Sequence, residues 1–398
     1  MGDFTLTNLL IVAAVAVVCP LIPALVPKIA IPSPVLEIIA GILLGPAVLG
    51  WVTIDEPVAI IALLGLAFLL FLAGQGVDVR KLRGNSIKLA VIGLAATFVL
   101  ALGTAYLFDA VNVSGAPLLV AIVLSSTSLG LVAPLLSNSG RMNGRFGQLV
   151  LAAATLSDVA CIMLLSALFS GDSSNAGTTV LLLVCLVLLG ILVALGLFEL
   201  RRWNRLQAAF KRLHGTTAHV RVRGAFLLML AFAALAQSLG LEVILGAFVA
   251  GVVLRFIRPE PAEGEPDPDH FEEKLQTAGY AIFIPVFFVS TGIQFDLVAL
   301  TKTPEALLAV PLFLLAILFT RGVPALLYRR EIGVHEARAA GLLQSTTLPM
   351  VVTATQIGVG LGVLSQATAA GLVTAGLLTV IIFPAVALGI LKRADLPT

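Results

Sequence analysis

Long apolar runs, separated by short polar or glycine- and proline-containing connections, recur along the whole chain. A helix needs about 20 such residues to cross a bilayer. We therefore predict thirteen transmembrane helices, at 5–25, 34–51, 57–76, 87–108, 115–137, 147–169, 178–199, 223–239, 240–256, 276–293, 304–328, 338–358 and 363–391. The runs are too long for the short alternating strands of a membrane β-barrel, so the predicted fold class is an all-α polytopic membrane protein.

Composition supports the same fold class. Of the 398 residues, 59% are hydrophobic and 12% are charged, whereas a soluble domain carries about 25% charged residues. This excludes a soluble enzyme, a secreted disulfide scaffold and a disordered chain. The net charge of +2 gives no sign of a nucleic-acid partner, and we expect neither enzymatic activity nor a cofactor.

The basic residues predict the orientation in the membrane. If the N-terminus lies outside, 22 of the 24 Lys and Arg residues fall on the cytoplasmic side, as the positive-inside rule requires. Lys302 lies outside, and Arg321 lies within the span at 304–328. We therefore predict an outside N-terminus and a cytoplasmic C-terminus, in what we expect to be a bacterial cytoplasmic membrane.

Three short stretches recur in the same order in the two halves of the chain, seven predicted spans apart. The matches are Leu36–Gly41 with Leu241–Gly246, Gly74, Asp78 and Leu82 with Gly292, Asp296 and Leu300, and Ser126–Leu129 with Ser345–Leu348. A separation by an odd number of spans gives the two copies opposite orientations. The pattern predicts two inverted six-helix repeats joined by the span at 178–199, an architecture typical of alternating-access transporters.

Polar residues interrupt two spans that correspond in the repeat, at 115–137 and 338–358. Serine and threonine compete with helical hydrogen bonding, and Pro134 and Pro349 each remove a backbone donor. We predict that both helices are discontinuous and cross, with breaks at Ser125, Ser126, Ser345, Thr346 and Thr347. The alternative is that small polar residues only let the helices pack closely.

Asp158 is the only carboxylate near the middle of a predicted span. A charge there costs about 2.5–3.5 kcal/mol on insertion scales, which favours a functional role. Such a carboxylate can hold a proton or a monovalent cation, and Ser157, Thr127 and Ser128 offer additional oxygen ligands. Arg321 either neutralises Asp158 or holds the carbonyl groups of a broken helix. The alternatives are a structural ion pair of Asp158 with Arg321, or an arginine that snorkels to the interface.

Four other acidic residues lie near the ends of predicted spans. Glu37 and Glu242 correspond in the repeat, and we interpret them either as anchors at the membrane interface or as carboxylates at the mouth of a cavity. Asp78 and Asp296 are interpreted as caps at helix ends.

Several of these stretches also occur in a known family. They are Pro34–Pro46, Leu70–Gly74, Leu124–Ser128, Leu245–Gly251 and Gly279–Gly292. The chain resembles the monovalent cation:proton antiporter-2 family, which is related to sodium/proton exchangers and potassium-efflux antiporters. The resemblance extends over nearly the whole chain.

The resemblance implies a dimerising panel, formed by 1–82 and 223–300, and a moving core, formed by 83–170 and 301–398, with 171–222 as a linker. It also implies that Asp158 binds the ion, with Arg321 nearby. Electrogenic relatives carry two consecutive acids where this chain has Ser157 and Asp158, so we expect electroneutral exchange. We expect no C-terminal nucleotide-binding regulatory domain.

The sequence thus leads to the hypothesis of a homodimeric antiporter in the lipid bilayer that exchanges Na⁺ or K⁺ for H⁺. Two alternatives stay open: a sodium-coupled symporter of an organic anion on a related inverted-repeat fold, and a membrane sensor that transports nothing.

Overall fold

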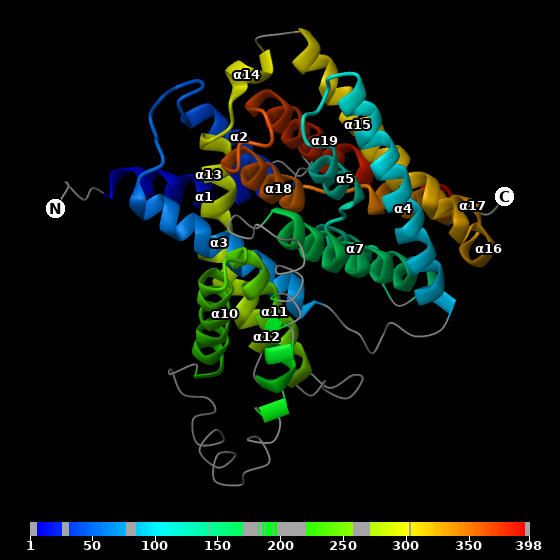
Figure 1. Cartoon of the computed structure of the whole chain (residues 1–398), viewed down its shortest axis with the longest axis horizontal. Helices are drawn as coiled ribbons and strands as arrows, with labels where there is room; N and C mark the ends of the chain where they lie inside the picture. The colour runs from blue at the N-terminus through cyan, green and yellow to red at the C-terminus, as the bar shows by residue number, and fades with distance from the viewer. Residues whose placement is uncertain are drawn as a thin grey trace. The chain divides into compact units, whose positions relative to one another are not determined.

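The computed structural model describes residues 6–25, 32–76, 85–142, 144–169, 182, 185–186, 188–193, 195–196, 220–257, 271–301 and 304–394. These residues form helices joined by short connections and contain no β-strand (Figure 1). The helices are α1 (Thr7–Leu25), α2 (Ser33–Leu44), α3 (Glu56–Gln75), α4 (Asn85–Ala110), α5 (Pro117–Ser125), α6 (Leu129–Asn138), α7 (Arg145–Phe169), α10 (Val220–Ser238), α11 (Val243–Ile257), α12 (Phe271–Ala278), the π-helix η1 (Gly279–Phe283), α13 (Ile284–Ile293), α14 (Leu297–Thr301), α15 (Pro304–Ala325), the 3₁₀-helix η2 (Leu326–Tyr328), α16 (Arg329–Ile332), α17 (Val334–Gln344), α18 (Pro349–Gly360) and α19 (Gln366–Ala394).

Seven helical segments of the described chain are long and apolar enough to cross a membrane, and three shorter apolar helices accompany them. This confirms an all-helical, multi-pass membrane protein. Every predicted span except one coincides with one to three described helical segments. Half of the span predicted at 178–199 lies outside the described residues, so the count of thirteen and the inverted symmetry stay predictions. The connection between α10 and α11 is short and contains Gly240 with φ at 71°, a backbone conformation that glycine adopts without strain.

The chain divides into two compact units, which do not follow the panel and core ranges expected from the resemblance. One unit comprises 1–55, 79–165 and 288–398, and the other comprises 56–78 and 166–287. In the first unit α5 packs against α18 and α4, and α19 packs against α15, α17 and α18. In the second, α11 packs against α3 and α10. The panel and the moving core stay predictions.

Two close helix crossings, one in each unit, are built on glycine in the same way. A Cβ on Gly41 would lie 2.2 Å from the Val289 carbonyl oxygen, and one on Gly292 would lie 2.1 Å from that of Ile38. Each glycine therefore contacts the carbonyl three residues before its partner glycine. Only residues without a side chain allow helix backbones to approach so closely.

The second crossing repeats this arrangement between α3 and α11. A Cβ on Gly74 would lie 2.1 Å from the Phe248 carbonyl oxygen, and one on Gly251 would lie 2.0 Å from that of Phe71. The packing therefore aligns Gly41 with Gly251, whereas the sequence match aligned Gly41 with Gly246. The sequence alone leaves the register open because each stretch carries two glycines, Gly41 in α2 with Gly45 at its end, and Gly246 and Gly251 in α11.

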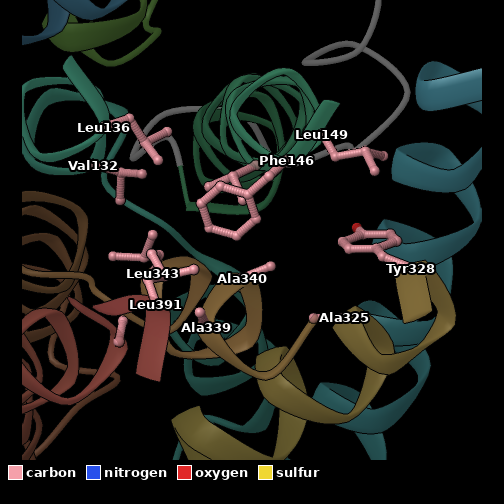
Figure 2. Packing of buried hydrophobic residues seen from close by; sticks show 12 residues of the cluster. Val132, Leu136, Phe146, Leu149, Ala325, Tyr328, Ala339, Ala340, Leu343 and Leu391 are labelled. Carbon is pink, nitrogen blue, oxygen red and sulfur yellow. The ribbon is translucent and has the colours of Figure 1, made fainter. Parts of the chain in front are cut away.

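A hydrophobic cluster in the first unit fixes the half-helices α6 and α17 (Figure 2). Phe146 of α7 lies among side chains of both half-helices, and Tyr328 lies beside Leu149. The cluster consists of Val132, Leu136, Phe146, Leu149, Val150, Ala325, Tyr328, Ala339, Ala340, Leu343, Ala387 and Leu391. Because these side chains come from α6, α7, α15, η2, α17 and α19, they hold the broken helices against three longer ones.

Candidate functional site

The two interrupted helices cross at their breaks. Between α5 and α6 lie Ser126–Ser128, called here the first segment, and between α17 and α18 lie Ser345–Leu348, the second segment. The Ser128 N–H donates to the Thr346 carbonyl at 2.9 Å, and the hydroxyl oxygens of Ser126 and Thr347 are 2.7 Å apart. Non-helical backbone would be costly in lipid. Here it is buried inside the protein, and the two segments form hydrogen bonds with each other.

Proline marks only one of the two breaks. Pro349 is the first residue of α18, where its missing N–H costs nothing, whereas Pro134 lies inside α6. In the first segment the break coincides instead with consecutive hydroxyl residues. Ser125 is the last helical residue of α5, and its hydroxyl donates to the Ala121 carbonyl at 2.8 Å.

The carboxyl end of α5 is capped by side chains. A helix leaves its last four carbonyls without helical partners, and here each accepts a side-chain hydrogen bond. The pairs are the Cys161 thiol with Ile122 (3.5 Å), the Ser126 hydroxyl with Val123 (2.8 Å), the Thr320 hydroxyl with Leu124 (2.9 Å) and the Ser157 hydroxyl with Ser125 (2.6 Å). Ser157 thus orients α5, and its proton is directed away from the carboxylate of its neighbour.

Arg321 caps the carboxyl end of α17. Its side chain is 1% exposed, and its Nε–H donates to the Gln344 carbonyl at 3.3 Å. A terminal nitrogen of the guanidinium donates to the Thr127 hydroxyl, which in turn donates to the same Gln344 carbonyl at 2.6 Å. The positive charge therefore lies where the helix dipole is negative. In the described part of the chain, Arg321 and Asp158 form no direct ion pair.

Asp158 lies at the other end of the crossing, on α7. Its Oδ2 accepts a hydrogen bond from the Leu129 N–H at 3.2 Å, at the amino end of α6. That end of a helix attracts negative charge. The carboxylate is only partly buried, and no other group of the described residues donates to it. One oxygen of the carboxylate is therefore available to another partner.

The remaining predicted residues have different positions. Glu37 is buried on α2, and Glu242 is partly exposed just before α11. No described hydrogen bond joins either one to the crossing, so their role at a cavity mouth or interface stays a prediction. Asp296 accepts the Ala299 N–H at 2.7 Å, which confirms it as a helix cap, whereas Asp78 lies outside the described residues.

Sequence reasoning missed several polar groups at the crossing. Thr320 precedes Arg321 directly, so its position next to an intramembrane charge could have indicated a role. Gln344 contributes its backbone carbonyl, which carries no sequence signal. Cys161 and Thr379 give little signal in the sequence, because an isolated cysteine or threonine in an apolar span usually serves packing or bonds only to its own helix.

Comparison with known proteins identifies the family. Residues 13–392 match the profile described as sodium/hydrogen exchanger, transmembrane. The chain belongs to this exchanger family. This confirms the resemblance to cation:proton antiporters seen in the sequence.

Curated relatives of the chain carry similar names. The putative Na⁺/H⁺ antiporter YjbQ of Bacillus subtilis is 29% identical over all of this chain, which spans only 65% of YjbQ. The probable Na⁺/H⁺ antiporter 3 of Methanocaldococcus jannaschii is 26% identical over 92% of both chains. The Na⁺/H⁺-K⁺ antiporter GerN of Bacillus cereus is 28% identical over 67% of this chain and 66% of GerN.

A solved structure supports the fold. The structure of the sodium proton antiporter MjNhaP1 of Methanocaldococcus jannaschii is similar to that of this chain, with a TM-score of 0.66, over 98% of this chain and 99% of MjNhaP1. The sequence identity is 19%, so the similarity concerns the fold alone.

Proposed function

We propose that this exchanger is a monovalent cation/proton antiporter that works by alternating access, with Asp158 holding either H⁺ or Na⁺ or K⁺. The observation that carries the proposal is the Asp158 carboxylate beside the crossing, where a single backbone N–H holds one of its oxygens at 3.2 Å. One oxygen remains for an ion or a proton, and both cannot neutralise the same carboxylate at once. Mutual exclusion at one group is the basis of obligate exchange.

The charges around the crossing favour one-for-one exchange. Arg321 does not lose its proton in proteins, and its hydrogen bonds to Gln344 and Thr127 keep it in place. Ser157, which stands where electrogenic relatives carry a second acid, is neutral and bonded to the Ser125 carbonyl. Only one negative charge is then available among the described residues at the crossing, so each cycle carries one cation in one direction and one proton in the other.

The crossing also offers oxygen atoms to a cation, which hard monovalent ions prefer. The Thr127 hydroxyl already contacts Arg321 and Gln344, so it can reach a cation only by changing partner. The Ser128 side chain is 7% exposed, and its hydroxyl forms no hydrogen bond within the described chain, which makes it the more readily available ligand. The broken ends of both helices supply the remaining oxygens in this proposal.

The test is cation-driven proton flux in proteoliposomes with a pH-sensitive dye inside. Asp158→Asn keeps the size of the side chain and removes its charge, so we expect exchange to fall to the level of empty vesicles. Asp109→Asn, near the end of α4, is the matched control and should retain wild-type exchange. Undiminished flux in Asp158→Asn would disprove the assignment.

Two further measurements with wild-type protein sharpen the proposal. Competition for one carboxylate predicts that the cation KM rises as the external pH falls, with an unchanged maximal rate. One-for-one exchange predicts that turnover creates no membrane potential and that clamping the potential with valinomycin and K⁺ leaves Na⁺-driven flux unchanged. A potential generated by turnover would refute the one-for-one stoichiometry while leaving Asp158 as the binding group.

Selectivity and assembly belong to the same proposal. Comparison of Na⁺, K⁺ and Li⁺ at several pH values decides between the cations, since the name of GerN includes both Na⁺ and K⁺. We also propose that the exchanger is a homodimer, which mass measurement of the detergent-solubilised protein by light scattering tests directly.

A further inference from the structure

Thr379 on α19 holds the backbone of the second segment. Its side chain is fully buried, and its Oγ1 accepts the Thr347 N–H at 3.1 Å. The same hydroxyl lies 2.9 Å from the Thr347 carbonyl and 2.7 Å from that of Gly376, to either of which it can donate. Thr347 lies between two half-helices, so its backbone groups have no helical partners. One side chain therefore satisfies the N–H of a buried, non-helical residue and lies within hydrogen-bonding distance of its carbonyl, and either group would be costly to leave unpaired.

Thr347 is also hydrogen-bonded to the first segment, so its position affects that segment. Its hydroxyl oxygen is 2.7 Å from that of Ser126, the residue that precedes Thr127. The adjacent Thr346 carbonyl accepts the Ser128 N–H at 2.9 Å. A shift of Thr347 would therefore move both ends of the first segment, where the proposed cation ligands lie.

Thr379 and Asp158 play corresponding parts on the two sides of the crossing. Asp158, on α7, accepts a backbone N–H at the start of α6, and Thr379, on α19, accepts one two residues before α18. The two acceptors differ in one respect. A bound proton or cation neutralises the charge of Asp158, and this changes the strength of the hydrogen bond that Asp158 accepts from the Leu129 N–H. Thr379 carries no charge, so the hydrogen bond that it accepts from the Thr347 N–H does not depend on what occupies the site.

We propose that Thr379 is a positioning residue of the cation site, which fixes the second segment equally in the ion-loaded and ion-free states. It does not contact the cation itself and acts through Thr347 and Ser126. This inference rests on the proposed antiport function.

The first test compares Thr379→Val with Thr379→Ser in proteoliposomes. Valine has nearly the same shape but no hydroxyl, so we expect the cation KM to rise about tenfold, equivalent to about 1.4 kcal/mol, whereas serine should restore wild-type KM. Thr374→Val on the same helix is the matched control, because the Thr374 hydroxyl bonds only to Ala370 at 2.8 Å, one turn earlier. A wild-type KM in Thr379→Val, or a serine variant as impaired as the valine variant, would overturn the inference.

The second test needs no variant and so does not depend on how Thr379→Val folds. Amide hydrogen exchange of the wild-type protein is followed by mass spectrometry with and without Na⁺. We expect peptides covering 126–131 to change their exchange when Na⁺ is added, and peptides covering 345–348 to remain equally protected. An equal or larger change at 345–348 would refute a fixed second segment. Failure of the antiport proposal would appear separately, as undiminished cation-driven proton flux in Asp158→Asn.

Discussion

The glycine crossing between α2 and α13 can be tested by adding one methyl group. In Gly41→Ala the new Cβ would lie 2.2 Å from the Val289 carbonyl oxygen and 2.9 Å from the Gly292 Cα. Ordinary van der Waals contact begins near 3.4 Å, so the two helices must separate by about 1 Å. Both opposing atoms belong to the backbone, and no side chain can rotate away to relieve the clash.

The expected loss of stability follows from two opposing effects. Overpacking a well-packed interior typically costs about 1–3 kcal/mol or more, whereas alanine gains up to about 1 kcal/mol over glycine within a helix. Because the clash is with backbone, we expect the upper part of the overpacking range and a net loss of about 1–2 kcal/mol. Gly103→Ala in α4 is the matched control, since no atom lies within 4 Å of its new Cβ.

The assay is thermal unfolding of the detergent-solubilised exchanger, followed by fluorescence-detected size-exclusion chromatography. Gly41→Ala should lower the midpoint by several degrees, and Gly103→Ala should leave it unchanged or raise it slightly. Gly251→Ala, whose Cβ would lie 2.0 Å from the Phe71 carbonyl oxygen, should behave like Gly41→Ala. A midpoint for Gly41→Ala equal to or above that of Gly103→Ala would show that the helices are not packed this closely.

Three further predictions concern polar contacts in the first unit. Thr127→Val removes the donor to Gln344 and the acceptor for Arg321, so we expect the free energy of unfolding to fall by about 2–4 kcal/mol and exchange to be impaired. Thr127→Ser should avoid both effects, and equal unfolding midpoints for the two variants would contradict this. Arg321→Met removes two charge-assisted hydrogen bonds, each worth about 1.5–3 kcal/mol, and should lower the unfolding midpoint further than Thr127→Val, with Arg321→Lys between wild type and Arg321→Met. Glu336→Gln breaks a partly exposed 3.2 Å ion pair with Arg141 and should cost less than about 1 kcal/mol, an effect that high salt abolishes; a large, salt-insensitive loss would point to a further role for this pair.

The sequence was sufficient to predict the helical fold and the places where two helices break. Apolar runs of bilayer length are a strong signal, because only helices satisfy every backbone group within one segment. Clusters such as Ser125–Ser128 are a second strong signal, because several hydroxyls together compete with helical hydrogen bonding. Pro134 was misleading, since this proline lies within α6 rather than at the break.

The sequence did not reveal which groups meet at the crossing. Arg321 was expected either to neutralise Asp158 or to hold the carbonyls of a broken helix, and the structure has it hydrogen-bonded to the Gln344 carbonyl. That choice depends on how α15 packs against α17, which sequence spacing does not determine. Backbone acceptors such as the Ser125 carbonyl have no identity in the sequence at all. For the same reason the hydrogen-bond partners of Ser157 and Thr379 could not be predicted from the sequence and required the structure.

The short lengths of the half-helices set the electrical position of the crossing. The four half-helices contain 9, 10, 11 and 12 residues, which at 1.5 Å per residue gives lengths of about 14–18 Å, or roughly half of the ~30 Å hydrocarbon layer. An ion at the crossing has therefore traversed about half of the transmembrane field. Entry of one charge to this depth is worth about 1.1 kcal/mol per 100 mV, half of the value for a complete crossing. If one proton then moves along the same path in the opposite direction to the cation, the two contributions cancel, and the membrane potential neither drives nor opposes the cycle.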